Sequence, residues 1–239
     1  MSSHKLLAWF DQDEALVETH HNAIEALDEG DNRRSFLKKA GIGGALMMGS
    51  GALFAALAPA GADAAKGGDG RPPAKFGKGD IGILNYALTL EHLEAGFYNE
   101  ATKLNIAKTP ESQAFLKQVT ADENAHVAFF SKALGSKAVA APKLDFGASF
   151  ESEASWLKVS MALENTGVAA FAGQALNIAS PANVAAAVSV MTVEARHASV
   201  VGLLNKPTPS NISPNGAFDK PMTAAEVLKV VEGTGFIVG

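Results

Sequence analysis

The sequence predicts an all-α fold: a bundle of four long helices, with a long connection between the second and third, and a short fifth helix at the carboxyl end. Four apolar segments are each bounded by residues that start or stop helices. Hydrophobic residues make up 47% of the chain and charged residues 19%, which suits a folded helical domain and does not suit a disordered chain. The chain also repeats internally, because two similar helix pairs follow one another.

Capping signals place the first two helices. Asp80 can cap a helix over about residues 81–104. The pair Thr109-Pro110 is a cap with proline at the first helical position, and the second helix that it opens ends near Gly135.

Similar signals place the second pair of helices. A long connection over residues 136–148 leads to a third helix, which opens at Ser149 or Ser152 and runs to about residue 177. The pair Ser180-Pro181 repeats the cap-and-proline signal and opens a fourth helix to about residue 205. The predicted bundle therefore covers residues 80–205.

The carboxyl-terminal residues 206–239 are predicted to be a loop followed by a short helix. The stretch KPTPSNISPNGAFDKP is rich in proline and small polar residues, which favours a loop. Thr223-x-x-Glu226 is a capping box that opens a short final helix, expected to end at Gly233.

Residues 1–64 are predicted to be an export signal with a long acidic leader. Arg33 and Arg34 are followed by Ser-Phe-Leu-Lys-Lys and an apolar run over residues 40–60, the pattern of a twin-arginine signal. Small-residue cleavage patterns follow, and residues 65–79 resemble a linker. We expect the twin-arginine machinery to export the chain across the cytoplasmic membrane, into the periplasm or outside the cell. An uncleaved apolar run would leave a membrane anchor.

Composition excludes several classes of site and partner. The chain of 239 residues is long enough for one sizeable core and an accessory segment. An isoelectric point of about 5.7 provides no basic surface for nucleic acid, so we expect no nucleic-acid partner. The absence of cysteine excludes thiolate zinc sites, disulfides, iron–sulfur clusters and a rubredoxin-type module.

Two copies of Glu-x-x-His indicate the chemistry. They are Glu123-x-x-His126 and Glu194-x-x-His197, and the helix before each carries a single glutamate, Glu91 or Glu164 respectively. Residues three apart project from one face of a helix. Two Glu-x-x-His helices and two single-glutamate helices provide the ligand set of a dinuclear metal site inside a four-helix bundle.

Electrostatics also favours a metal site. A carboxylate buried without a partner is costly or takes up a proton, and four carboxylates facing each other repel strongly. Two divalent cations would cancel four negative charges. Carboxylate and imidazole ligands together suit iron or manganese, and zinc also accepts them.

The first helix offers two candidate ligands. At about 100° per residue, Glu94 lies about 60° from Glu91, on the flank of the same face. Tyr98 lies seven positions after Glu91 and therefore on the face of Glu91, which favours Glu91 as the ligand.

The segments LEHLEAGFY, ADENAHVAFF, ALENTGVAAF and TVEARHASVV resemble the ferritin-like superfamily, specifically its exported ferritin-like-domain proteins. The resemblance covers about residues 80–205 and implies a ferritin-like bundle with six ligands: Glu91, Glu123, His126, Glu164, Glu194 and His197. It also implies that Glu123 and Glu194 bridge the two ions. Tyr98 would stand beside the ligands, although a packed core aromatic would fit the same position. Unlike rubrerythrins, the chain has no cysteine-bound iron module, so it lacks a built-in electron donor.

These observations lead us to expect an exported protein with two divalent metal ions per chain, iron or manganese. Its substrate would be a small oxidant, oxygen or peroxide, handled by a stress-protective oxidase or peroxide scavenger. One alternative is a manganese-catalase-like enzyme. Another is a non-enzymatic stress or desiccation-protection protein whose metals only hold the bundle together.

Overall fold

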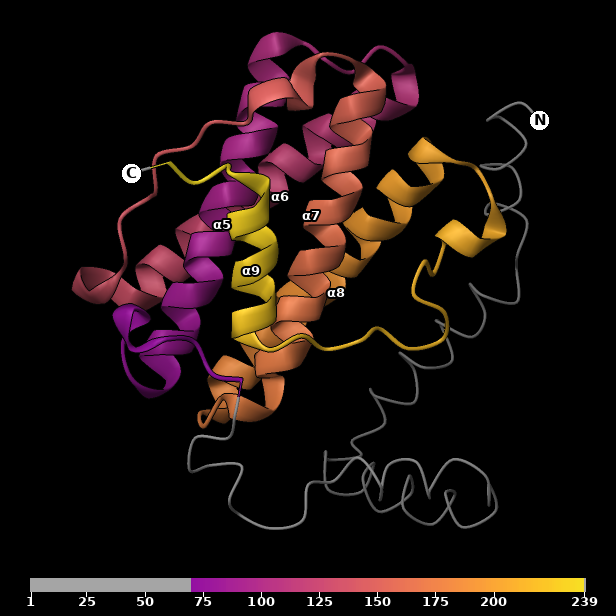
Figure 1. The fold of residues 1–239 in the computed structure, drawn as a ribbon. Coiled ribbons are helices and arrows are strands. Elements are labelled where there is room, and N and C mark those ends of the chain that lie inside the picture. The colour runs from indigo at the N-terminus through magenta and orange to yellow at the C-terminus, as the bar shows by residue number, and fades with distance from the viewer. Residues whose placement is uncertain (1–69, 239) are drawn as a thin grey trace, which may run out of the picture. The chain divides into compact units, whose positions relative to one another are not determined.

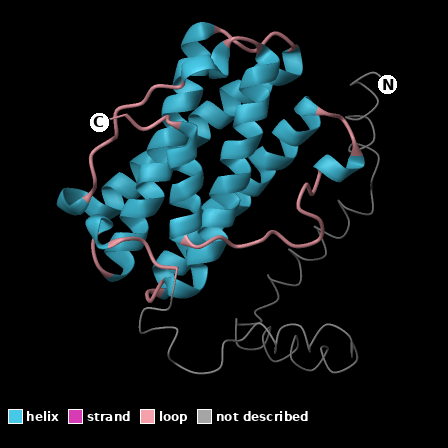
Figure 2. Ribbon diagram, in the orientation of Figure 1, coloured by secondary structure: helices cyan, strands magenta, loops and turns pink. Residues whose placement is uncertain are grey.

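The structure, a computed structural model, describes residues 70–238. These residues form five α-helices with short 3-10 turns between them (Figures 1 and 2). The prediction of an all-α helical bundle is confirmed. The predicted export signal and acidic leader lie outside the described residues.

Four long helices form the bundle: α5 (Gly79–Leu104), α6 (Pro110–Leu134), α7 (Glu153–Gln174) and α8 (Pro181–Asn205). The closest pairs are α5 with α6 and α7 with α8, so each half of the sequence repeat is a helical hairpin. Contacts between α5 and α7 and between α6 and α8 join the two hairpins (Figure 1).

Of the two serines predicted to open the third helix, Ser152 caps α7 and accepts a hydrogen bond from the backbone N–H of Ser155. Both predicted caps that precede a proline are also confirmed. The Thr109 side chain accepts a hydrogen bond from the backbone N–H of Ser112, and the Ser180 side chain caps α8 in the same way. The predicted cap at Asp80 is wrong, because α5 begins at Gly79 and Asp80 lies in its first turn. The Asp80 carboxylate instead accepts backbone N–H groups from Ala179 and Ser180, at 2.8 and 2.9 Å. It therefore ties the start of α5 to the start of α8.

The short helix α9 (Ala224–Thr234) packs against α7, with Ala224, Val227 and Val231 buried (Figure 1). The predicted capping box at its start is confirmed, and the helix ends one residue beyond the expected position. Just before α9, the backbone of Met222 approaches α7 so closely that a side chain at Gly173 would overlap the Met222 carbonyl oxygen.

The segments around the bundle also contribute to its core. Residues 70–78, within the expected linker, pack against the helices through buried Phe76. The connection between α6 and α7 carries the 3-10 turns Gly135–Lys137 and Gly147–Phe150, and an isolated bridge joins Leu144 to Ile237.

The core consists of two apolar clusters. On α6, one cluster contains Phe115 and Val119 and the other contains Phe130. On α8, the clusters contain Val201 and Val190 respectively. The Glu-x-x-His motifs of both helices lie between these positions, so apolar packing flanks the charged centre along the bundle.

Candidate metal centre

Two groups of side chains lie inside the bundle, each with three glutamates and one histidine. The first is Glu91, Glu123, His126 and Glu194, and the second is Glu123, Glu164, Glu194 and His197. Within each group, one potential ligand atom per residue lies within 4.8 Å of the others. The structure therefore brings together all six residues that the sequence suggested as ligands.

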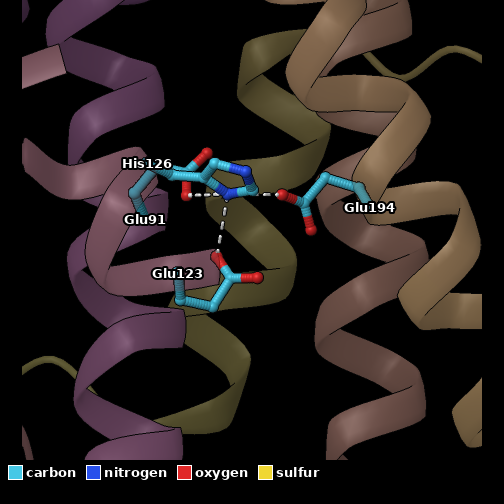
Figure 3. A group of neighbouring side chains, drawn as sticks. All are labelled: Glu91, Glu123, His126 and Glu194. Carbon is cyan, nitrogen blue, oxygen red and sulfur yellow. Dashed lines mark hydrogen bonds and ion pairs between the residues drawn. The ribbon is translucent and has the colours of Figure 1, made fainter. Parts of the chain in front are cut away.

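In the first group, three carboxylates surround one ring nitrogen (Figure 3). Nδ1 of His126 lies 3.2 Å from Glu91 Oε2, 3.4 Å from Glu123 Oε2 and 3.0 Å from Glu194 Oε1. These side chains come from α5, α6 and α8, so the bundle must be assembled before the group exists.

The second group repeats this arrangement around His197. Nδ1 of His197 lies 3.1 Å from Glu123 Oε1, 3.3 Å from Glu164 Oε2 and 3.7 Å from Glu194 Oε2. None of these contacts has the geometry of a hydrogen bond. The oxygens and the nitrogen surround a common point instead of pairing with one another.

Two carboxylates belong to both groups. Glu123 presents Oε2 to His126 and Oε1 to His197, while Glu194 presents Oε1 to His126 and Oε2 to His197. Glu91 contacts only the first histidine and Glu164 only the second. This is the arrangement expected if two shared carboxylates join two metal positions.

Burial tests whether these residues fit a metal. Glu91, Glu123, Glu164 and Glu194 are all 0% exposed, yet each has at least one buried oxygen without a hydrogen-bond partner among the described residues. Unpaired buried oxygens are costly, and a cation would satisfy them. The donor set of carboxylates and imidazoles therefore fits two divalent ions.

The pKa values of the carboxyl groups of the centre shift in different directions, because the two histidines act more strongly on Glu194 than on the others. Burial raises the pKa of Glu91 well above its ordinary value, and the nearby Glu194 and Glu123 raise it further. Burial likewise raises the pKa of Glu164. Burial would also raise the pKa of Glu194, but His126 and His197 together lower it to about 2.

Burial and the nearby carboxyl groups act in opposite directions on the pKa values of the two histidines. Burial alone would lower the pKa of His126, but Glu123, Glu194 and Glu91 raise it to about 12. The pKa of His197 is raised in the same way by Glu123, Glu164 and Glu194, against the effect of burial. Without a metal, the raised pKa values of Glu91, Glu164, His126 and His197 favour the protonated forms of these four groups.

Glu94 is a fifth buried carboxylate beside this centre. It is 3% exposed, its Oε2 has no hydrogen-bond partner, and its pKa is raised well above the ordinary value by burial and then by Glu194 and Glu123. A Cβ at Gly167 would lie 3.1 Å from Glu94 Oε1, so the glycine on α7 leaves room for this side chain. Of the two candidates on α5, Glu91 belongs to the first group of potential ligands and Glu94 belongs to neither group, although both side chains are buried.

Tyr98 lies next to the predicted ligands. It is fully buried, and its hydroxyl donates a hydrogen bond to Glu164 Oε1. It also packs edge-on against Phe115, so the alternative of a core aromatic describes the same side chain. The hydrogen bond orients Glu164 with Oε2 towards His197.

Asp122 is a contact that sequence reasoning missed. Its Oδ2 lies 3.1 Å from Nε2 of His197, on the side of the ring opposite the other carboxylates. Its position directly before Glu123 was the available signal. Asp122 also lines a groove of about 510 Å³ between α6 and α8, together with Phe115, Gln118, His126, Arg196 and His197.

Comparison with known proteins agrees with this geometry. The family model described as "Ferritin-like domain" matches residues 79–206, which is the whole four-helix bundle and more than half of the chain. No curated protein matches the sequence. The chain belongs to the ferritin-like domain family.

Proposed function

We propose that this protein binds two divalent metal ions, iron or manganese, and uses them to react with oxygen or peroxide. The observation that carries the proposal is the set of buried, unpaired carboxylate oxygens gathered around two histidine nitrogens. Glu91 and His126 would hold one ion and Glu164 and His197 the other, with Glu123 and Glu194 shared. We expect the ions to lie roughly 3.5–4 Å apart, as in other two-metal sites.

When bound, the metals supply a site that binds and polarises the oxidant. The protein's own residues do the rest. The apolar clusters on either side exclude bulk water from the four buried carboxylates and hold the helices that carry them in place. The Tyr98 hydroxyl donates a hydrogen bond to Glu164 Oε1. This bond would hold Glu164 in place if its carboxylate changed the way in which it binds the metal.

The way into the centre favours a small substrate. The carboxylates have no exposure, whereas His126 and His197 are 8% and 6% exposed and line the groove between α6 and α8. The imidazole rings of His126 and His197 therefore contact both the groove and the carboxylates of the centre. Oxygen and hydrogen peroxide are small enough to use such an entrance, and this size limit supports them over larger organic substrates.

Metal content is the first test. Protein purified from its own compartment should contain about two iron or manganese ions per chain, and anomalous scattering should place them between the four helices. His126→Ala and His197→Ala should each lower the affinity for one ion more than for the other. Glu111→Gln, a change at an exposed position of α6, should leave the affinity for both ions unchanged. Absence of any specific site under metal-replete conditions would contradict the proposal.

Turnover separates the proposed enzyme from its alternatives. A manganese-catalase-like enzyme would convert two peroxide molecules to one oxygen and two waters without a reductant. A peroxide scavenger or oxidase would consume an added reductant in proportion to the oxidant. A protein that binds both metals but turns over neither oxidant would support the non-enzymatic alternative, in which the metals only stabilise the bundle.

We also propose export by the twin-arginine machinery after folding and metal loading. The support is the sequence around Arg33 and Arg34, together with the need to choose between similar divalent ions where their supply is controlled. Replacing both arginines by lysine should stop accumulation of the mature protein outside the cytoplasm. Unchanged export would refute the pathway, and export of metal-free protein would refute the order of loading.

A further inference from the structure

The two histidines of the centre differ in what supports them. Nε2 of His197 faces Asp122 Oδ2 at 3.1 Å, while its Nδ1 faces the metal group. A carboxylate at this position holds the proton on Nε2, keeps the Nδ1 lone pair directed at the metal and makes the ring a stronger ligand. No described side chain forms a hydrogen bond with Nε2 of His126.

The sequence repeat shows where this difference arises. Asp122 directly precedes Glu123 on α6 and reaches the histidine of α8. The corresponding residue, directly before Glu194 on α8, is Val193. Both residues line the groove that the two histidines share. The chain therefore supplies a supporting carboxylate to His197 and an apolar side chain at the matching position near His126.

A second, independent observation concerns the same half of the centre. Glu94 follows Glu91 by three on α5, whereas the residue that follows Glu164 by three on α7 is Gly167. A Cβ at Gly167 would lie 3.1 Å from Glu94 Oε1 and 3.8 Å from Glu194 Oε2, the Glu194 oxygen that faces His197. Both oxygens therefore lie beside the same point on α7, the helix that carries Glu164, and the half of the centre built on α7 has a glycine where α5 has a fifth buried carboxyl group.

We propose that the dinuclear centre is asymmetric, and that the position formed by His197 and Glu164 fills first and holds its ion more tightly than the position formed by His126 and Glu91. This inference rests on the proposed function, since it assumes that both positions bind a divalent ion. Asp122 acts as a positioning residue, because it works through His197 and does not face the metal group itself.

Substoichiometric loading tests the order directly. Metal-free full-length protein is given one equivalent of Mn²⁺, crystallised, and measured at the manganese absorption edge. We expect the anomalous signal beside His197 and Glu164, and at two equivalents a signal at both positions. Equal occupancy at one equivalent, or filling of the His126 position first, would overturn the asymmetry while leaving the proposed function intact. Failure to bind either Mn²⁺ or Fe²⁺ at any position would overturn both.

Titration of variants tests the cause. Calorimetry with Mn²⁺ should resolve a tighter and a weaker step, and Asp122→Asn should weaken the tighter step by about 10- to 100-fold with little change in the other. Val193→Asp should strengthen the weaker step, because it gives His126 the carboxylate that it lacks. Glu111→Gln is the matched control on α6 and should change neither step. Equal weakening of both steps by Asp122→Asn, together with no effect of Val193→Asp, would refute the role of Asp122.

Discussion

Metal binding should release an unusually large number of protons. In the metal-free protein, five carboxyl and imidazole groups of the described residues have raised pKa values: Glu91, Glu94, Glu164, His126 and His197. Raised pKa values keep these groups protonated to higher pH than usual, whereas a divalent ion binds carboxylates and neutral imidazoles. Two ions should therefore displace about four to five protons, and the overall affinity should rise by about four to five decades per pH unit while all of them are protonated.

The uncertain proton in this count belongs to Glu94. If Glu94 ionises, five buried carboxylates face two divalent ions and the centre keeps one negative charge. If Glu94 stays protonated, the remaining four carboxylates balance the two ions. Glu94→Gln, which has nearly the same shape, should reduce the release by about one proton in the first case and leave it unchanged in the second.

Proton release can be counted without any assumption about turnover. Calorimetric titration with Mn²⁺ in two buffers of different ionisation enthalpy gives the number of protons per ion, and a pH indicator in lightly buffered solution gives an independent value. Gln113→Ala, a change at an exposed position of α6, is the control and should release the same number of protons as the unchanged protein. Release of two or fewer protons per pair of ions would refute the protonation pattern argued here.

Three further changes have defined outcomes. Tyr98→Phe should lower the free energy of unfolding by about 1–3 kcal/mol, because Glu164 loses a buried donor, whereas Tyr86→Phe, which removes a hydroxyl without a partner, should be nearly neutral in the same denaturant titrations. In the presence of a chelator, the melting temperature should fall as pH rises above about 4.5, because Glu91, Glu94 and Glu164 keep their protons to higher pH in the folded protein than in the unfolded chain. Above about pH 6.5 His126 adds to this fall, because it stays protonated up to about pH 12 only when folded. Metal-loaded protein should lack this slope. Gly173→Ala should cost about 1–3 kcal/mol or more in unfolding free energy, because its Cβ overlaps the backbone ahead of α9; an unchanged melting curve would contradict that packing.

Much of the bundle could be predicted because its signals are local. A serine or threonine followed by proline marks a helix start through hydrogen bonds made within one turn, and both such starts are confirmed at Thr109 and Ser180. The error at Asp80 has a non-local cause. Its carboxylate accepts N–H groups from residues about a hundred positions away, at the start of α8, and no local pattern reveals that partner.

The Glu-x-x-His residues were also predictable, since spacing alone places each pair on one helix face and the repeat doubles the pattern. The choice between Glu91 and Glu94 was not. Angular position on α5 placed Glu94 on the flank of the face that carries Glu91 and favoured Glu91 as the ligand, but it did not predict that both side chains would be buried beside the centre. Gly167, on a different helix, removes the side chain that would otherwise occupy the space of Glu94. A missing side chain on a facing helix has no signature within α5 itself.

The internal repeat by itself would give a symmetric centre. The positions at which the two halves differ are therefore the ones that can make the two metal positions unequal. Asp122 and Val193 are matching positions, as are Glu94 and Gly167, and within each pair the two residues differ in charge. Either difference, seen in sequence alone, resembles ordinary variation on a helix. Assembly of the bundle puts the Asp122 carboxylate behind His197, and it brings Glu94 and the oxygen of Glu194 that faces the same histidine to the space beside Gly167. Two unrelated substitutions therefore act on one metal position, so the asymmetry is a property of the assembled centre and not of any single motif.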